Sequence, residues 1–254
     1  VVVARGDRLF AVMMSTRWPE ETGPNVRHLR IMVHPDHRGE GWARTLLRFA
    51  ERQDTPPTTT LETNIMGRWI AGEQFAVEEG FKPIRKDLFL AREGPVPEAL
   101  EPPPGFTIRP DRGPEDDEAW ARLNHDGYAH KSAYTPLTDE DLKQHRATPG
   151  FTLVFAESDG VPCGLCHVMD WQDEGPYINS VVVSNAMRGR GLARPLTVAG
   201  IRAALGEDGG KIHLNVYADN ESAVHVYESL GFKRTSEATT WRKVRSASPA
   251  WHRT

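Results

Sequence analysis

A glycine-rich phrase occurs twice in this 254-residue chain, 150 positions apart. The first copy reads Arg38-Gly-Glu-Gly-Trp-Ala43 and the second reads Arg188-Gly-Arg-Gly-Leu-Ala193. Each copy follows an apolar extended run, precedes a helix-like segment and is closed further on by a Gly-Phe pair, at Gly80-Phe81 and Gly231-Phe232. Solenoid repeats have periods of only about 20–50 residues. A period this long therefore predicts a duplicated domain.

The two copies define two mixed α/β domains. Residues 1–93 form the first domain, 94–105 a proline-rich and therefore semi-rigid linker, 106–246 the second domain, and 247–254 a tail. The second domain reaches Arg188 only after a strand from Phe106, two helices and a hairpin, whereas the first reaches Arg38 within 38 positions. We therefore expect about 44 residues, a strand and two helices, to be missing from the front of the first domain.

Periodicity and turn residues place the elements along the chain. The expected strands are 1–4, 9–15, 26–33, 61–65 and 83–91 in the first domain, and 106–109, 151–157, 161–170, 177–183, 211–217 and 235–244 in the second. The expected helices are 43–53, 66–79, 114–130, 138–145, 192–205 and 221–230. The strands over 83–91 and 235–244 are predicted to close the sheets of the first and second domain respectively.

Bulk properties exclude several classes of function. A net charge of −4 and a pI near 6.2 argue against a general nucleic-acid binder. No apolar run approaches the ~20 residues that span a bilayer. No signal peptide is visible, and two cysteines do not make a disulfide framework, so the sequence predicts a cytoplasmic protein with no membrane partner.

Two further patterns resemble functional sites, and we interpret both as structural. Cys163 and Cys166 lie three apart on an expected strand, where their side chains point to opposite faces, and no second pair exists for zinc. We expect buried, inert thiols. His34 and His37 flank the first glycine phrase, and a solvated turn explains them better than a ligand pair. No metal site is predicted.

The second glycine phrase has the composition of a phosphate-binding loop. A strand followed by glycines at a helix start leaves main-chain N–H groups unpaired, and these groups, with the positive end of the helix dipole, bind phosphate. Gly189 and Gly191 allow close approach and positive φ, while Arg188 and Arg190 add positive charge. Alone, this pattern also fits an ordinary helix-capping turn.

A second motif follows at a suitable distance, and together the two resemble the GCN5-related N-acetyltransferase (GNAT) family. The family pattern is Arg/Gln-x-x-Gly-x-Gly/Ala, then Asn-x-x-Ala-x-x-x-Tyr-x-x-x-Gly-Phe. The matching residues are Arg188, Gly191 and Ala193, followed by Asn220, Ala223, Tyr227, Gly231 and Phe232. The resemblance covers the whole second copy and part of the first. Phe151–Cys166 and Asn215–Phe232 also resemble the mycothiol synthases, a tandem-domain branch of the family.

The resemblance implies acetyl-CoA as acyl donor and no metal. Main-chain groups of the fourth strand would hold the pantetheine and polarise the thioester carbonyl, and the glycine phrase would hold the pyrophosphate. The implied cofactor contacts are Val181, Val182, Val183, Arg188, Gly189, Arg190, Gly191, Leu192, Ala193, Asn220 and Ser222.

The implied catalytic residues are Tyr227, which would protonate the departing thiolate, and Asn179. Tyr227 could instead be an ordinary core side chain. Many family members carry a glutamate base on the fourth strand, where this chain has Asn179, which can only orient a water or the substrate amine. Other base candidates acting through water are Asp170, Asp173 and Glu174, for which a solvated acidic loop fits equally well. Candidate acceptor contacts are Tyr128, His130 and Tyr134.

The first copy departs from the family pattern. Counting back from Gly80 places Ala76 at the position of Tyr227, and Glu40 replaces Arg190. Trp42 stands in place of Leu192. We expect this degenerate domain to be inactive, either a structural partner or a weak CoA binder.

These observations predict an N-acetyltransferase whose second domain acetylates a primary amine of a small molecule by direct attack. One alternative is a peptide or protein N-acetyltransferase. The other is a non-catalytic CoA-binding sensor, favoured by the missing carboxylate and opposed by the intact loop and Tyr227. Thioester cleavage with a panel of amines, measured beside CoA binding, separates them. The acceptor and the oligomeric state stay open at this point.

Overall fold

The computed structural model describes residues 1–16, 26–52, 60–130, 134–171 and 174–244. The chain divides into two compact units. Unit 1 comprises Val1–Lys86 and Ala238–Thr254, and unit 2 comprises Asp87–Glu237. The predicted tail, 247–254, lies outside the described residues.

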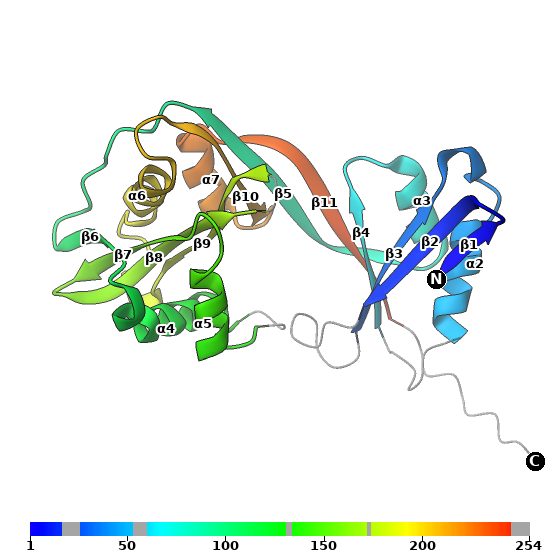
Figure 1. Cartoon of the computed structure of the whole chain (residues 1–254), viewed down its shortest axis with the longest axis horizontal. Helices are drawn as coiled ribbons and strands as arrows, with labels where there is room; N and C mark the ends of the chain where they lie inside the picture. Colours follow the sequence, from blue (N-terminus) through cyan, green and yellow to red (C-terminus); the bar gives the residue numbers. More distant parts are fainter. Residues whose placement is uncertain (17–25, 53–59, 131–133, 172–173, 245–254) are drawn as a thin grey trace, which may run out of the picture. The chain divides into compact units, whose positions relative to one another are not determined.

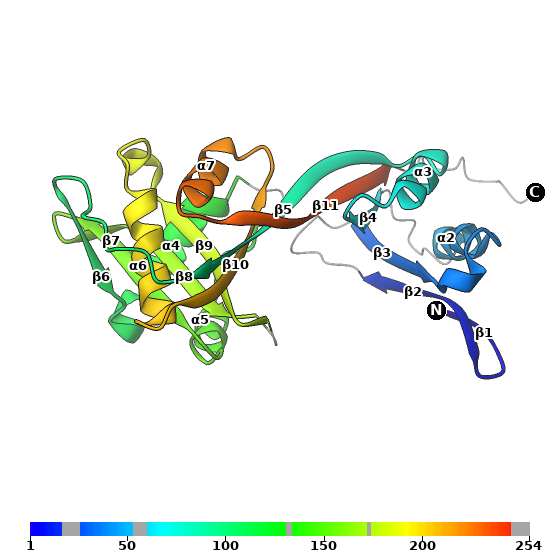
Figure 2. The same cartoon turned by 90° about the horizontal axis from the view of Figure 1, so that it is seen from above.

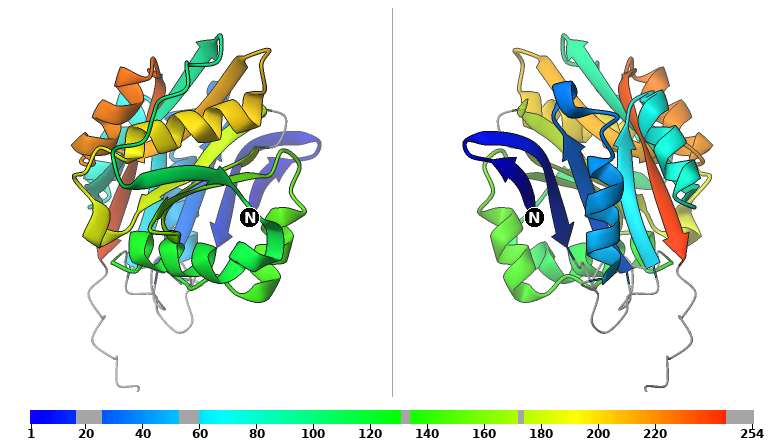
Figure 3. Two further views of the ribbon diagram at one scale, coloured as in Figure 1. Left: turned by 90° about the vertical axis from the view of Figure 1, so that its left-hand side faces the viewer. Right: turned by 90° about the vertical axis from the view of Figure 1, so that its right-hand side faces the viewer.

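In unit 1 the strands follow one another in the order β1-β2-β3-β4-β11. Its strands are β1 (Val2–Arg5), β2 (Arg8–Thr16), β3 (Val26–Val33), β4 (Thr60–Met66) and the part of β11 (Lys233–Val244) that starts at Ala238. β3 and β4 are parallel, and the other neighbours are antiparallel. Helices α2 (Trp42–Arg52) and α3 (Ile70–Glu78) complete unit 1. The elements of this unit are in front in the right panel of Figure 3.

The core of unit 1 forms where apolar strand positions meet these two helices. Alternation along β2 and β3 brings Ala11, Met13 and Leu29 into one buried cluster with Leu47 of α2 and Ala76 of α3. The cluster therefore fixes both helices against the strands that precede them.

In unit 2 the strands follow one another in the order β5-β10-β9-β8-β7-β6. Its strands are β5 (Lys82–Gly94, from Asp87), β6 (Phe106–Pro110), β7 (Thr152–Ser158), β8 (Val161–Asp170), β9 (Pro176–Val183) and β10 (Gly210–Tyr217). Helices α4 (Asp117–Tyr128) and α5 (Asp139–Arg146) lie against one face, and α6 (Ala193–Leu205) and α7 (Glu221–Ser229) lie on the opposite side (Figures 1 and 2).

The two faces of unit 2 have separate cores. Tyr227 and Leu196 belong to the cluster beneath α6 and α7, whereas Trp120 and Leu123 belong to the cluster beneath α4 and α5. Helix α6 approaches the sheet so closely that a Cβ on Gly200 would lie 2.3 Å from the Cys166 Sγ. Only glycine permits this contact.

The closing strands differ from the prediction. The sequence assigned 83–91 to the first domain and 235–244 to the second, yet Asp87–Gly94 runs antiparallel to β10 in unit 2. Ala238–Val244 runs antiparallel to β4 in unit 1. Each of these runs thus pairs with a strand from the other half of the sequence, so the unit boundaries differ from the predicted domain boundaries at 93 and 106. Both runs follow a Gly-Phe pair, and their pattern specifies a strand without specifying its partner.

Several element ends also differ. Met66 ends β4 instead of starting a helix, and α3 begins only at Ile70. The first turn of the helix expected over 114–130 is a 3-10 helix, Gly113–Asp116, and α4 follows it. Thr138 caps α5 through a full capping box with Asp141.

The predictions for the cysteines and the linker can be compared directly with the structure. Cys163 and Cys166 are buried free thiols on β8, as expected, and burial raises both pKa values, that of Cys166 to about 12. The linker lies along unit 2: the Arg202 guanidinium of α6 donates to the Pro97 carbonyl over 2.8 Å, and Leu100 packs against the core. Among the described helices, none is long and apolar enough to cross a membrane.

Candidate functional site

The site begins where two parallel strands of unit 2 separate. β9 and β10 are in register only at Tyr177 and His213. Beyond that pair, Val181 to Val183 stay paired with β8 on one side while their other edge faces the widening gap. The Tyr177 hydroxyl donates a hydrogen bond to Asn215 Oδ1, so a side-chain bridge spans the strands just past their last main-chain pair. Free main-chain groups therefore line one side of the gap.

The glycine phrase lies directly after β9 and opens α6. Gly189 has φ 76° and Gly191 has φ 80°, a conformation that L side chains rarely adopt. The first intrahelical bond of α6 runs from Leu196 N to Leu192 O, so the N–H groups of Leu192, Ala193 and Arg194 precede the helical ladder. Within the described residues, no main-chain bond is made by the N–H groups of Gly189 to Arg194.

Charge at this loop suits an anion. Arg188 and Arg190 are exposed, and Arg188 Nε donates to the Val183 carbonyl over 3.2 Å, which holds that side chain beside the end of β9. Leu192 is 1% exposed and belongs to the core, so it can contribute only its main chain to a ligand. The loop thus combines unpaired donors, a helix N-terminus and two guanidinium groups.

Tyr227 of α7 lies in the core cluster on the same side of the sheet. Its ring packs edge-on against Phe232, with centroids 5.8 Å apart. Burial raises the pKa of the Tyr227 phenol well above its usual range, and the neighbouring Cys166, Tyr128 and Tyr177 act in the same direction. The hydroxyl is therefore protonated at every physiological pH.

Asn179 occupies a bulge in β9. The register with β8 pairs His167 with Ser180 and Val168 with Ile178, which leaves Asn179 as the extra residue. Its amide nitrogen lies 3.1 Å from the Nδ1 atom of His167, a buried residue of β8. No sequence pattern indicated that His167 belongs to the site, because its contact with Asn179 depends on the bulge.

The other catalytic and acceptor candidates are dispersed. Tyr128 is half-buried, and burial raises its pKa to about 12. The hydroxyl of Tyr134 is buried without a hydrogen-bond partner in the described part of the chain, and its ring packs against His125. His130 and Glu174 are exposed.

Asp170 and Asp173 are the two aspartates predicted as bases that act through water. The carboxylate of Asp170 lies against Gly150, where a Cβ would stand 2.4 Å from its oxygen. Asp173 lies outside the described residues.

The remaining predicted cofactor contacts lie at the start of α7. Asn220 caps that helix by accepting a hydrogen bond from Ala223 N over 3.3 Å, and the Ser222 hydroxyl donates to the same Asn220 oxygen over 3.1 Å. The side-chain oxygen of Asn220 is thereby occupied. Its amide nitrogen and the main chain would have to make the predicted cofactor contact.

Unit 1 contains a cavity of about 360 Å³ at the equivalent place. β3 and β4 pair only from Val26 to His28 and from Thr60 to Glu62, and beyond these residues both strands line the cavity. Its walls also include the glycine phrase and α3, among them Ile31, Val33, Arg38, Gly41, Asn64 and Trp69.

The glycine phrase of unit 1 has the same backbone conformation as that of unit 2, but its side chains carry a different charge. Gly39 and Gly41 have φ 84° and 86°, close to the values of the second copy. The Glu40 carboxylate accepts a hydrogen bond from Trp42 Nε1 over 2.8 Å and lies 3.1 Å from His37 Nδ1. These two contacts hold the pKa of Glu40 below its usual range, so a negative charge stays in the loop.

The helix ends confirm how the two copies align. Phe81 N donates to Ala76 O over 2.9 Å, and Phe232 N donates to Tyr227 O over 3.1 Å. Ala76 therefore stands in unit 1 where Tyr227 stands in unit 2, and it carries no acid. The same alignment places Trp69 at the position of Asn220, and the Arg38 guanidinium lies 5.5 Å from its ring centroid.

Residues 116–232 match the model of the Acetyltransferase (GNAT) family. A mycothiol acetyltransferase from Catenulispora acidiphila is 33% identical to the chain over 245 residues, which cover 91% of this chain and 76% of the relative. The chain belongs to the GNAT acetyltransferase family. A second mycothiol acetyltransferase, from Thermomonospora curvata, is 31% identical and matches 80% of this chain and 69% of its own length.

Solved structures of this family share the fold. A GCN5-related N-acetyltransferase from Sphaerobacter thermophilus superposes with a TM-score of 0.76 at 22% identity, covering 94% of this chain and 78% of that one. A tandem GNAT protein from the clavulanic acid biosynthesis pathway superposes with a TM-score of 0.73 at 17% identity, covering 97% and 82%. The tandem architecture predicted from the repeat is therefore confirmed.

Proposed function

We propose that unit 2 of this acetyltransferase moves an acetyl group from acetyl-CoA to the primary amine of a small molecule. The observation that carries the proposal is the gap between β9 and β10, which opens beside a loop of unpaired N–H groups. A pantetheine arm fits along the free edge of Val181 to Val183, where main-chain groups can pair with its amides. The pyrophosphate fits on the loop from Arg188 to Ala193.

The chain's contribution to the reaction is mainly positional. A main-chain N–H at the free edge of β9 can donate to the thioester oxygen and stabilise the charge that develops there. Holding the amine against the carbonyl turns a bimolecular encounter into an intramolecular one, which supplies much of the rate. The new C–N bond forms as the C–S bond breaks, the amine loses one proton, and the sulfur gains one.

Tyr227 is the proposed donor of the proton that the sulfur gains. Burial keeps the phenol protonated and therefore available as a donor, and the same burial disfavours a free thiolate. The phenolate that remains after the transfer regains a proton from the acylated nitrogen, directly or through water, which balances the step. Asn179 is proposed to orient the amine or a water molecule at the bulge. An amide does not accept the proton, so the amine has to arrive in its neutral form.

A small-molecule acceptor is supported by the relatives, several of which are named mycothiol acetyltransferases. We include the unacetylated form of mycothiol in the acceptor panel for that reason, beside short peptides that represent protein substrates. Transfer to peptides alone would replace the small-molecule proposal. The cytoplasmic location expected from the sequence stays a prediction.

Unit 1 is proposed to be catalytically inactive. Ala76 removes the acid, and Glu40 opposes a pyrophosphate in the loop. Its cavity is compatible with weak CoA binding, so the division of labour has to be measured.

Calorimetric titration of acetyl-CoA into the full chain, with Gly191→Glu and Gly41→Glu as matched variants, tests the assignment. We expect one strong site that disappears only with Gly191→Glu, because the added carboxylate strains the loop and repels phosphate. Loss with Gly41→Glu alone would place the functional site in unit 1. Absence of any binding would contradict the acyltransferase proposal for this chain.

A further inference from the structure

We infer that His167 is a positioning residue that holds the Asn179 side chain at the β9 bulge for the acceptor amine. The inference rests on the proposed function, because it concerns the same site. It starts from the geometry of the bulge and the buried surroundings of the imidazole.

The bulge changes the direction of one side chain. Ile178 packs in the cluster beneath α6 and α7, and Val182 packs in the cluster beneath α4 and α5. Strict alternation would return Asn179 and Ser180 to opposite faces, yet Asn179 reaches His167 and Ser180 lies beside Tyr128 of α4. The side chains of Asn179 and Ser180 therefore both lie on the face of the sheet that α4 and α5 cover. The extra residue in β9 makes this arrangement possible.

Three aromatic rings pack against the ring of His167. Its centroid lies 5.2 Å from those of Trp120 and Phe151 and 5.4 Å from that of His145. The Arg146 guanidinium covers the outer faces of Trp120 and Phe151, at 5.5 and 5.4 Å from their centroids. The ring thus contacts both helices, α4 through Trp120 and α5 through His145.

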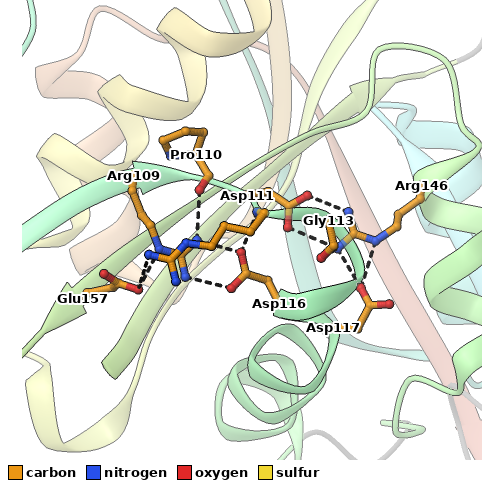
Figure 4. A network of polar contacts seen from close by, with 9 residues as sticks. Arg109, Pro110, Asp111, Gly113, Asp116, Asp117, Arg146 and Glu157 are labelled. Carbon is orange, nitrogen blue, oxygen red and sulfur yellow. Dashed lines mark hydrogen bonds and ion pairs between the residues drawn. The ribbon is translucent and has the colours of Figure 1, made fainter. Parts of the chain in front are cut away.

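Arg146 is itself fixed by carboxylates, as Figure 4 shows. It donates to Asp111 over 2.6 and 3.1 Å and to Asp117 over 2.9 and 2.7 Å. It also donates to the Gly113 carbonyl over 2.7 Å. A chain of contacts thus runs from this network through the aromatic rings to His167 and Asn179.

The His167 ring is neutral, so its Nδ1 atom can accept a hydrogen bond. An amide nitrogen donates and does not accept, so Nδ1 of His167 accepts from Asn179 and the neutral ring carries its proton on Nε2. Burial, together with the groups that face it, His145 and Arg146 of α5, lowers the pKa of His167 to about 3. Nδ1 therefore stays an acceptor throughout the physiological range.

The histidine is costly if its role is only structural. Within the described residues its Nε2 atom is buried without a hydrogen-bond partner, and an unpaired buried donor lowers the stability of the fold. A phenylalanine would fill the aromatic pocket without that loss. What phenylalanine cannot do is accept the hydrogen bond of Asn179.

The test compares His167→Phe, His167→Asn and Asn179→Ala in the full chain. His167→Phe keeps the ring and removes the acceptor, whereas His167→Asn restores an oxygen near the position of Nδ1. We expect His167→Phe to lower kcat/KM for the amine by about 10- to 100-fold. The Kd of acetyl-CoA should stay unchanged and the unfolding midpoint should not fall, and His167→Asn should recover part of the activity.

A double-mutant cycle separates positioning from packing. His167→Phe should have no further effect on kcat/KM in the Asn179→Ala background, because the partner is already gone. Additive losses, or wild-type kinetics for His167→Phe, would overturn the inference.

A second readout does not depend on turnover. In ¹⁵N NMR spectra of the full chain, His167 should be neutral with the proton on Nε2 between pH 5 and 8, and the Asn179 side-chain amide should shift in His167→Phe. A proton on Nδ1 would overturn the inference even in an active enzyme. An inactive wild type with the expected spectra would instead contradict only the proposed function.

Discussion

Burial of one phenol sets the chemistry at the scale of single residues. Burial keeps Tyr227 protonated in its apolar surroundings, so its hydroxyl is available as a proton donor. Tyr227→Phe keeps the ring contact with Phe232 and removes the hydroxyl. We expect kcat to fall at least about 100-fold, the usual effect of losing an acid catalyst, with an unchanged Kd for acetyl-CoA. Stopped-flow and calorimetric measurements on the same variant check both values, and unchanged turnover would remove the role.

The same raised pKa predicts the shape of the pH–rate profile. Loss of the Tyr227 proton lies above pH 10, since its pKa is higher than the ordinary value. Below that pH only deprotonation of the acceptor amine should govern kcat/KM, which should rise with pH and then level off. A falling limb between pH 7 and 9 in an otherwise stable enzyme would show that another acid is at work.

His167 predicts how stability depends on pH. The unfolded chain binds a proton at this residue near pH 6.5, but the folded chain does so only near pH 3. The free energy of unfolding is therefore unaffected above pH 6.5 and falls as pH drops through the window from 6.5 to 3. Between pH 6.5 and 5 the loss should be about 2 kcal/mol. Urea titrations of wild type and His167→Phe at both pH values check it, because the variant should lose this component.

Residues whose role follows from local pattern could be predicted, and residues whose role follows from register could not. The glycine phrase and Tyr227 lie at fixed spacings in one segment each, so the sequence alone suffices to propose them as site residues. The pair of Asn179 and His167 depends on one extra residue in β9. Alternation alone contains no information about where a strand is bulged.

At the scale of elements, partly buried ion pairs hold helices α4 and α5 in place. Arg109 of β6 donates to Asp116 and Glu157, and Arg146 of α5 donates to Asp111 and Asp117 (Figure 4). These contacts join β6, β7, α4 and α5. They keep the pKa values of both arginines above the usual range.

Replacing Arg146 should therefore cost far more than replacing an exposed arginine. Arg146→Leu leaves Asp111 and Asp117 without their cation, and breaking such a pair typically costs about 3–5 kcal/mol. Arg112→Ala is the control, since its side chain is exposed and its contact with Glu157 is 4.0 Å long. Urea unfolding should separate the two variants by several kcal/mol, and equal stabilities would contradict the role of the network.

Periodicity located nearly every element, but it did not identify the partners of the closing strands. The errors at Met66 and Pro114 are of one to four residues and arise at element ends, where caps and 3-10 turns compete. The wrong partners predicted for β5 and β11 are an error of a different kind. A strand's partner is decided by the whole sheet, and the two closing runs have similar patterns.

At the scale of the whole molecule, the exchange makes unit 1 depend on the end of the sequence. Trp241 belongs to the core of unit 1, and Arg242 donates to the buried Glu62 over 2.6 Å. Truncation after Glu237 removes this strand, uncovers the edge of β4 and leaves Glu62 without that cation. We expect residues 1–86 to lose protection from amide hydrogen exchange while unit 2, complete within Asp87–Glu237, keeps it. Truncation after residue 246 is the control and should change neither.

The exchange of closing strands also has a use. A break anywhere between residues 95 and 105 would separate the chain into two pieces, each of which carries one strand of the other's sheet. Neither piece could complete its own fold alone, but mixed together they could rebuild both. The protein is thus a natural starting point for a split reporter, in which recovered acetyl transfer reports that two fused partners have met.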